Sequence, residues 1–402
     1  MNQPLFLHIV ERLEGFLGKL PATIQKPILH ELTPLKELFL KQRPPRFVLT
    51  GSHKVPAQDV FAALFAAAQP GDLRDILVEV FRWHDLNVGN HGTIALLDAR
   101  GADEPAARKI EEELAREPAD MFLHLGDGDS GRPVLSRDVD LLVELAAFNR
   151  PLRSDAKIIG LSLVAPDRGN SRAKSVPDRQ AAEAKLQTAL SGNAAIRGQL
   201  AHVLELPLVP LEEEAPAGGM SPAAARFMSL VARELPNEAR VEMIRISRDR
   251  VAQAEIAQVL VKSASAISTA IGAQPIPLAD LPILTTLQLV MVSGIMYIAG
   301  RERSLRAATE FVGALGVNVG AGMVLREGTR AVLKFFPGWG NVVCGMVAGA
   351  GTYALGRAAI VYFLEGVSLK DARRTYLRSR KKPARAKLLT AHSQPSGKAA
   401  KN

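Results

Sequence analysis

The spacing of hydrophobic residues changes twice along this chain and divides it into regions of different structure. Residues 5–43 carry apolar side chains at helical spacing and are expected to form a helical lead-in. Residues 46–210 alternate short apolar runs with helix-like runs, which favours a three-layer α/β domain with a mostly parallel sheet. Strands are expected at about residues 47–51, 76–83, 94–98, 121–125, 157–164 and 203–209.

The strand pattern stops after residue 222, and the rest of the chain is expected to be helical. Residues Val241 to Ile271 have helix-forming composition, with an apolar stripe through Ile244, Val251, Ile256, Val259 and Leu260. Three stretches without any charged residue follow, at 281–300, 311–325 and 335–356. The first and last approach the roughly 20 residues that a helix needs to cross a bilayer.

These changes predict five regions. They are a helical lead-in (1–45), an α/β domain (46–210), a linker rich in Glu, Pro and Gly (211–222), an all-α C-terminal domain (223–366) and a basic tail (367–402).

The net charge of +9 belongs to the tail. Residues 370–401 contain eleven Lys and Arg against Asp371 as their one acid, so the remainder of the chain is close to neutral. Such a run is typical of a solvated end, and it also suits a membrane surface or a nucleic acid. Arg380, Lys381 and Lys382 are its densest cluster. Nucleic acid is the weaker expectation because Tyr376 is the one aromatic residue in 370–402.

Cysteine and histidine usage excludes several other classes. One cysteine, Cys344, rules out a disulfide framework and fits a reducing cytoplasm. The eight histidines lack the spacing of a metal site, so no metal is expected. The first twenty residues mix charged and apolar residues at helical spacing, unlike a signal peptide, so a cytoplasmic protein is expected.

The segment 46–65 has the order strand, turn and helix of a phosphate-binding loop, and Gly51 opens the turn. Five residues on, Pro56, Ala57 and Gln58 stand where such a loop has Gly, Lys and Ser or Thr. Proline offers no N–H to a phosphate, and alanine has no ammonium group. Lys54 lies three residues before the expected lysine. The loop is therefore expected to be degenerate.

Later segments follow the same layout. The strand at 94–98 ends in the D-x-x-G sequence of Asp98 and Gly101, and the strand at 157–164 is followed by Asp167, the last position of a guanine-reading box. This order resembles the Era-like branch of P-loop GTPases. The resemblance implies GTP and Mg²⁺ as the family's ligands, with Gly51, Asp98, Gly101 and Asp167 as the matching positions. Because the other functional positions are lost, no cofactor and no catalytic residue are expected, and any nucleotide site is vestigial.

The helical region carries a second resemblance, which covers about residues 237–366. Its string Pro275-Ile-Pro277-Leu-Ala-Asp280-Leu-Pro-Ile-Leu-Thr-Thr-Leu-Gln288 resembles the bacterial domain of unknown function that follows Era-like GTPase domains and ends the YcjF-type inner-membrane proteins. The resemblance implies association with the inner membrane. Gly345 and Gly349 have the G-x-x-x-G spacing that permits close helix contact, within a soluble core, a membrane or a homo-oligomer.

The sequence thus predicts a pseudo-GTPase that binds or scaffolds at the cytoplasmic face of the membrane, without enzymatic activity. Two alternatives stay open. The chain could be a GTPase that binds GTP through backbone groups and Lys54, or a nucleic-acid binder that uses its basic tail.

Overall fold

The structure is a computed structural model, and it describes residues 42–65, 80–88, 92–128, 132–164, 176–208, 222–273, 280–315 and 340–379. The chain divides into two compact units, one spanning Gln42–Asp249 and the other containing the described residues from Arg250 onward. We describe each unit by itself.

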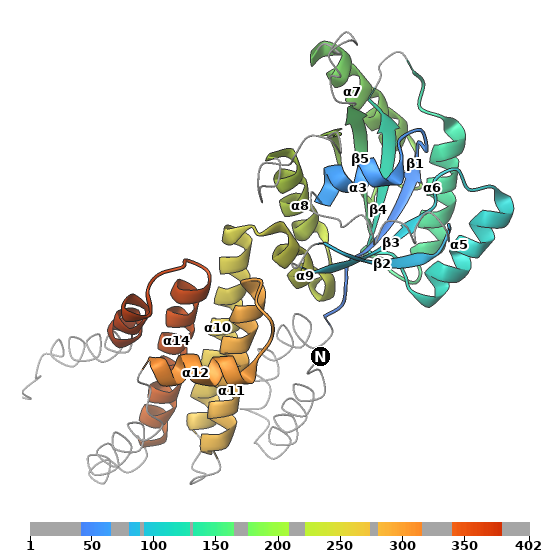
Figure 1. Cartoon of the computed structure of the whole chain (residues 1–402). Coiled ribbons are helices and arrows are strands. Elements are labelled where there is room, and N and C mark those ends of the chain that lie inside the picture. Colours follow the sequence, from blue (N-terminus) through green and yellow to red (C-terminus); the bar gives the residue numbers. More distant parts are fainter. Residues whose placement is uncertain are drawn as a thin grey trace, which may run out of the picture. The chain divides into compact units, whose positions relative to one another are not determined.

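The first unit is built on a six-stranded sheet (Figure 1). Its strands are β1 (Arg46–Gly51), β2 (Trp83–Asn87), β3 (Thr93–Asp98), β4 (Met121–Asp127), β5 (Lys157–Val164) and β6 (Leu200–Pro207). Their order is β2-β3-β1-β4-β5-β6, and every neighbouring pair is parallel except β2 and β3. This confirms the predicted α/β class with a mostly parallel sheet.

Burial explains which strands the sequence revealed. The central strands β1, β4 and β5 are covered on both faces and read as continuous apolar runs. The edge strand β2 alternates instead, with Leu86 buried and Asp85 and Asn87 exposed. The prediction of a strand at 76–83 was wrong at its described end, because residues 80–82 form a turn and the strand begins at Trp83. Residues 76–79 lie outside the described part.

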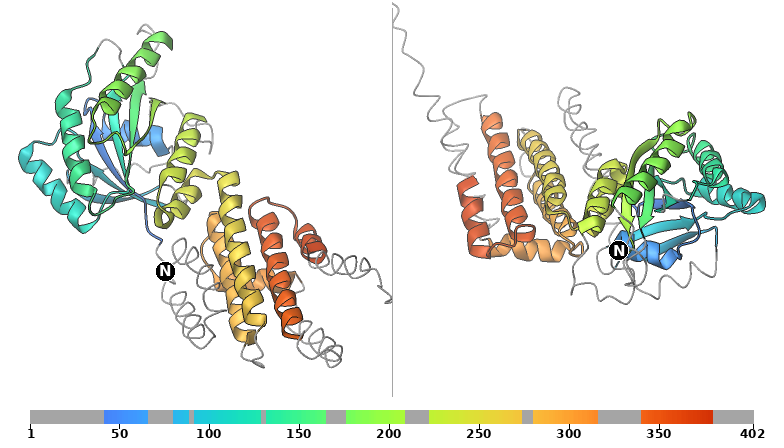
Figure 2. Two further views of the ribbon diagram at one scale, coloured as in Figure 1. Left: turned by 180° about the vertical axis from the view of Figure 1, so that it is seen from behind. Right: turned by 90° about the horizontal axis from the view of Figure 1, so that it is seen from above.

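Helices cover both faces of this sheet (Figures 1 and 2). They are α3 (Ala57–Phe65), α5 (Glu104–Arg116), α6 (Ser136–Asn149), α7 (Val176–Gly192), α8 (Pro222–Glu234) and α9 (Asn237–Ser247). Side chains of α5, α6 and α7 share one core with β1, β3, β4 and β5. Helices α3 and α8 pack on each other and on β6, and α9 contacts β3.

A buried carboxylate ties α9 to the start of the sheet. Asp120 is fully buried and accepts hydrogen bonds from the guanidinium of Arg43 (2.6 Å) and from the backbone N–H of Arg46 (3.0 Å). Arg153 extends the network, with its guanidinium 3.4 Å from Asp120 and 3.3 Å from Glu238 of α9. The unit therefore continues past the 211–222 segment expected to be a linker, and it includes α8 and α9.

The second unit is all helical in its described residues. It contains α10 (Arg250–Gly272), α11 (Asp280–Ile298), α12 (Leu305–Ala314), α14 (Gly340–Phe363) and a short helix at 369–379. This confirms the predicted all-α C-terminal region. The helix expected over 241–271 is interrupted, because Arg248 adopts a left-handed backbone (φ 54°) that ends α9.

Small residues allow α10 and α14 to pack closely. A Cβ added to Gly345 would lie 2.5 Å from the carbonyl oxygen of Thr269, and one added to Gly349 would lie 3.0 Å from the carbonyl oxygen of Ser265. A third helix joins through hydrogen bonds from Gln288 of α11 to Thr352 (3.0 Å) and from Thr352 to Ser268 of α10 (2.9 Å). The predicted glycine spacing thus serves contact within this chain.

The apolar stripe expected along α10 is only partly buried. Leu260 of that stripe is buried as expected, but Val251 and Val259 are 66% and 39% exposed, because the buried face of α10 runs through Ala257, Leu260 and Ala264. Over the described residues, no helix combines the length and the apolarity needed to cross a membrane.

Candidate functional site

Four of the predicted nucleotide-site residues lie at or just after the carboxyl ends of two neighbouring strands, β1 and β3. Strand β4 lies on the other side of β1 (Figure 1). The chain order reverses on either side of β1, which lies between β3 and β4. Ligands of open α/β sheets bind outside the carboxyl ends of the strands at such a switch point. Gly51 ends β1, Asp98 ends β3 and Asp127 ends β4, so this edge of the sheet is the candidate site.

Gly51 is explained by the packing of the sheet itself. Its φ of 90° lies in the left-handed region, and an added Cβ would clash with the carbonyl oxygen of Leu125 on β4. The following N–H, from Ser52, donates to the same carbonyl oxygen at 2.8 Å. A phosphate-binding loop would direct such an amide at its ligand. Here the first amide after the glycine extends the β1–β4 pairing instead.

Asp98 is held by an arginine from its own motif. Both carboxylate oxygens of Asp98 accept hydrogen bonds from the guanidinium of Arg100, from Nε at 2.8 Å and from Nη2 at 2.7 Å. The arginine side chain is 5% exposed and that of Asp98 is 16% exposed. The pair is bidentate, the strongest geometry of an arginine and a carboxylate. In a GTPase-like site this carboxylate would face Mg²⁺, and here its charge is already balanced.

The same guanidinium also fixes the loop after β1. Nη1 of Arg100 donates to the carbonyl oxygen of Val55 at 2.8 Å and approaches that of Ser52 at 3.5 Å. These carbonyls therefore face a cation. A phosphate cradle has the opposite polarity, because its loop presents N–H groups to an anion. The loop is shaped to accept positive charge from within the chain.

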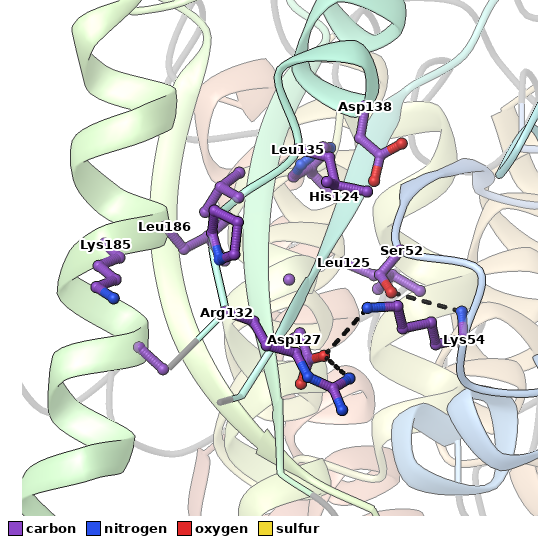
Figure 3. Close-up of a pocket in the computed structure, with 14 residues that line it drawn as sticks. Ser52, Lys54, His124, Leu125, Asp127, Arg132, Leu135, Asp138, Lys185 and Leu186 are labelled. Carbon is purple, nitrogen blue, oxygen red and sulfur yellow. Dashed lines mark hydrogen bonds and ion pairs between the residues drawn. The ribbon is translucent and has the colours of Figure 1, made fainter. Parts of the chain in front are cut away.

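Lys54 crosses the mouth of the site toward Asp127 (Figure 3). Its ammonium lies 3.9 Å from Oδ2 of Asp127, and its side chain is 53% exposed. Arg132 binds the same oxygen more closely, at 2.7 Å. A half-exposed pair at 3.9 Å contributes little to stability, so Lys54 is able to turn toward another anion at small cost.

A small hollow lies beside this cluster, between the start of α6 and α7 (Figure 3). Its cavity volume is about 30 Å³, whereas sites for small organic ligands usually measure about 300–1,000 Å³. Polar residues on its wall include Ser52, Lys54, His124, Asp127 and Asp138. The space suits one or two water molecules better than a nucleotide.

His124 on β4 is the buried titratable group of this wall. Its ring is fully buried, its Nδ1 lies 3.0 Å from the hydroxyl of Thr50, and burial lowers its pKa from 6.5 to about 4. Burial raises the pKa of Asp138 at the start of α6, against the opposing charges of His53, Arg137 and Lys54. His124 is therefore neutral at physiological pH.

The structure brings together four of the predicted nucleotide-site residues, Gly51, Lys54, Asp98 and Gly101. Gly101 has a φ of 71°, and a Cβ there would contact the ring of His53 at 3.6 Å. The motif search missed Arg100 because it occupies an x position of D-x-x-G. The sequence did carry a signal for Arg100. It is a cationic residue placed two positions after Asp98, a carboxylate expected to bind a cation.

The other predicted site residues are elsewhere. Gln288, Gly345 and Gly349 pack inside the helical unit, and Asp280 is the first residue of α11. Six of them lie outside the described residues, namely Asp167, Pro275, Pro277, Arg380, Lys381 and Lys382. In the described ranges, no group of three or more His, Cys, Asp or Glu side chains is placed to hold a metal ion.

Comparisons with known proteins add little to this geometry. The chain matches no family model and no curated protein. Among solved structures it is similar to an oligomerised bacterial dynamin pair, described as a mechanism for the long-range sensing and tethering of membranes. The identity is 11%, the match covers 97% of this chain and 78% of that chain, and the TM-score is 0.29. At this TM-score the likeness carries no argument, and the fold assignment rests on the sheet topology.

Proposed function

We propose that this protein is a non-catalytic, GTPase-like binding or scaffolding protein. The observation that supports the proposal is the occupation of the candidate site by Arg100, which neutralises Asp98 and holds the carbonyls of the β1 loop. A bound Mg²⁺·GTP would compete with this guanidinium for the same carboxylate. Hydrogen bonds to charged groups contribute about 1.5–3 kcal/mol each, so the competition costs several kcal/mol.

The loop after β1 supplies few interactions that could offset this cost in binding free energy. Pro56, Ala57 and Gln58 lack the amide, the ammonium and the hydroxyl that a phosphate loop supplies, and each loss removes about 1–3 kcal/mol of binding. Among the described residues, the hollow at this sheet edge measures about 30 Å³, well below the usual size of a small-molecule site. We expect a GTP affinity no tighter than about millimolar and negligible hydrolysis.

Lys54 favours the second candidate function, a GTP-binding protein with an atypical loop. Its ammonium stands at the mouth of the site on a side chain that is 53% exposed. For Lys54 to bind a phosphate of GTP, the contacts of Arg100 would have to rearrange when GTP binds.

We further propose that the protein works at the cytoplasmic face of the membrane. The charge of the C-terminal region supports this, because residues 370–401 carry eleven Lys and Arg against one acid. So does the resemblance of residues 237–366 to the domain found in inner-membrane proteins. Scaffolding needs no chemistry at the sheet edge, which is consistent with a site closed by its own side chains.

The nucleotide content of the purified full-length protein tests the proposal. The protein should release no guanine nucleotide when it is denatured and the supernatant is analysed by ion-exchange chromatography. A variant that carries Pro56→Gly, Ala57→Lys and Gln58→Ser should still retain little, because Arg100 remains. Addition of Arg100→Ala to that variant should raise retention. Stoichiometric GDP or GTP in the unmodified protein would favour the second candidate.

A further inference from the structure

The short helix at residues 369–379 follows α14 and has two chemically different faces (Figure 1, red end of the colour scale). One face is buried, with Ala372 fully buried and Tyr376 7% exposed. The spacing of four residues places both side chains on one side of the helix. The opposite side therefore faces outward.

The outward side combines basic and apolar residues. Lys370, Arg374 and Arg378 recur every four residues along one stripe, and all three are exposed. A neighbouring stripe holds Leu369, Arg373 and Leu377, and its leucines are 36% and 46% exposed. Exposed leucines among basic side chains are typical of a helix that lies in the plane of a membrane surface.

Contacts between neighbouring residues stabilise this helix. Ser368 precedes its first turn, and its hydroxyl oxygen accepts the N–H of Asp371 at 3.2 Å. The same hydroxyl donates to the carboxylate of Asp371 at 2.7 Å, as in an N-terminal cap. Asp371 is the helix's one acid, and it also pairs with Arg374 at 3.2 Å. The helix thus keeps a net charge of +3 across 369–379.

We propose that the outward face of this helix docks on an anionic lipid bilayer. The inference rests on the membrane association proposed above and names the surface responsible. Basic residues are attracted to an anionic leaflet, and leucines insert at the boundary of headgroups and acyl chains. A nucleic acid fits less well, because Tyr376 is turned inward and cannot stack on a base.

Vesicle flotation with the full-length protein tests the proposal. The variant changes Lys370, Arg374 and Arg378 to Gln. Its matched control changes Arg108, Lys109 and Arg116, three exposed basic residues of α5, to Gln, so that the net charge is equal. With vesicles of phosphatidylcholine and phosphatidylglycerol at low salt, the helix variant should partition about ten- to a hundred-fold more weakly than the unmodified protein. The α5 control should change by less than about three-fold.

A second variant, Leu369→Ser with Leu377→Ser, keeps the charge and should reduce the fraction that stays bound after a high-salt wash. Equal binding by the unmodified protein and both helix variants would overturn the helix assignment and leave membrane association standing. A full-length protein that ignores anionic vesicles would contradict membrane association itself. A different outcome is that an oligonucleotide displaces the unmodified protein from vesicles but leaves the Lys370, Arg374 and Arg378 variant in place. That result would assign the outward face to nucleic acid. None of these vesicle results changes the outcome of the nucleotide-content test on the purified protein.

Discussion

The guanidinium of Arg100 and the carboxylate of Asp98 form two parallel hydrogen bonds of 2.8 and 2.7 Å at the carboxyl end of β3. The two residues belong to one turn, so the pair forms without any distant contact. Because Arg100 also donates to the carbonyl oxygen of Val55, this turn and the loop after β1 are held as one piece. Arg100 thereby joins two segments of the candidate site.

We predict that Arg100→Ala destabilises the first unit by about 2–4 kcal/mol, because it leaves a largely buried carboxylate and a loop carbonyl without their partner. Urea unfolding of the full-length protein, followed by Trp83 fluorescence in a Trp339→Phe background, measures this. The double variant Arg100→Ala with Asp98→Ala should lose less than the sum of the single variants.

Arg108→Ala is the matched control. Arg108 pairs with Glu104 at 2.8 Å, but the two side chains are 75% and 80% exposed, so the loss should stay within about 0.5 kcal/mol. An equal loss in Arg100→Ala and Arg108→Ala would show that the Arg100 pair is no more than a surface contact.

His124 predicts a pH dependence of stability. Its pKa falls from 6.5 to about 4 on folding, so the unfolded chain takes up a proton below about pH 6.5 while the folded chain stays neutral. The contribution is complete above pH 6.5 and is lost as the pH falls toward 4, by about 3 kcal/mol over the range. His124→Gln should flatten this part of the profile in urea titrations from pH 7 to 4.5.

His53→Gln is the control, because His53 is exposed and the variant keeps the buried imidazole of His124. Its pH profile should match that of the unmodified protein. Profiles of the unmodified protein and His124→Gln that run parallel below pH 6.5 would mean that carboxylates alone set the acid sensitivity.

Sequence patterns predicted most of the fold because the central strands are buried on both faces and leave continuous apolar runs. They misplaced the edge strand, whose Trp83–Asn87 segment is polar on one side. They also joined α9 to α10, since the helical break at Arg248 depends on one left-handed backbone angle that a non-glycine residue rarely signals. At the site, motif spacing located Gly51, Asp98 and Gly101. It could not reveal Arg100, because the D-x-x-G motif leaves its two middle positions unspecified and Arg100 is one of them.

Gly349 of α14 should be sensitive to substitution. An added Cβ would meet the hydroxyl of Thr269, and the backbone oxygen of Ser265 at 3.0 Å. We expect Gly349→Ala to separate α10 from α14 and to destabilise their packing by about 1–3 kcal/mol. Hydrogen exchange of the two helices, read by mass spectrometry, should become faster.

Gly351 on the same helix has open space around its Cα, so Gly351→Ala should leave exchange unchanged or slow it slightly. Faster exchange in both variants would indicate that the backbone of α14, rather than its contact with α10, is being perturbed.

The boundary of the first unit can be tested by truncation. Helix α8 buries Phe227, Met228, Val231 and Ala232 within this unit. A fragment of residues 42–249 should therefore unfold in one cooperative transition. The fragment 42–210, which matches the boundary expected from the linker composition of 211–222, should expose the surface that α8 covers and aggregate. A cooperative, monodisperse 42–210 fragment would restore the earlier boundary.

We propose that Arg100 occupies the place of a nucleotide's metal and phosphate. The most direct measurement is a calorimetric titration of the full-length protein with GTP in the presence of Mg²⁺. We expect no saturable heat up to about millimolar GTP, and a measurable response only when Arg100→Ala is combined with Pro56→Gly, Ala57→Lys and Gln58→Ser. Micromolar binding of Mg²⁺·GTP by the unmodified chain would contradict it.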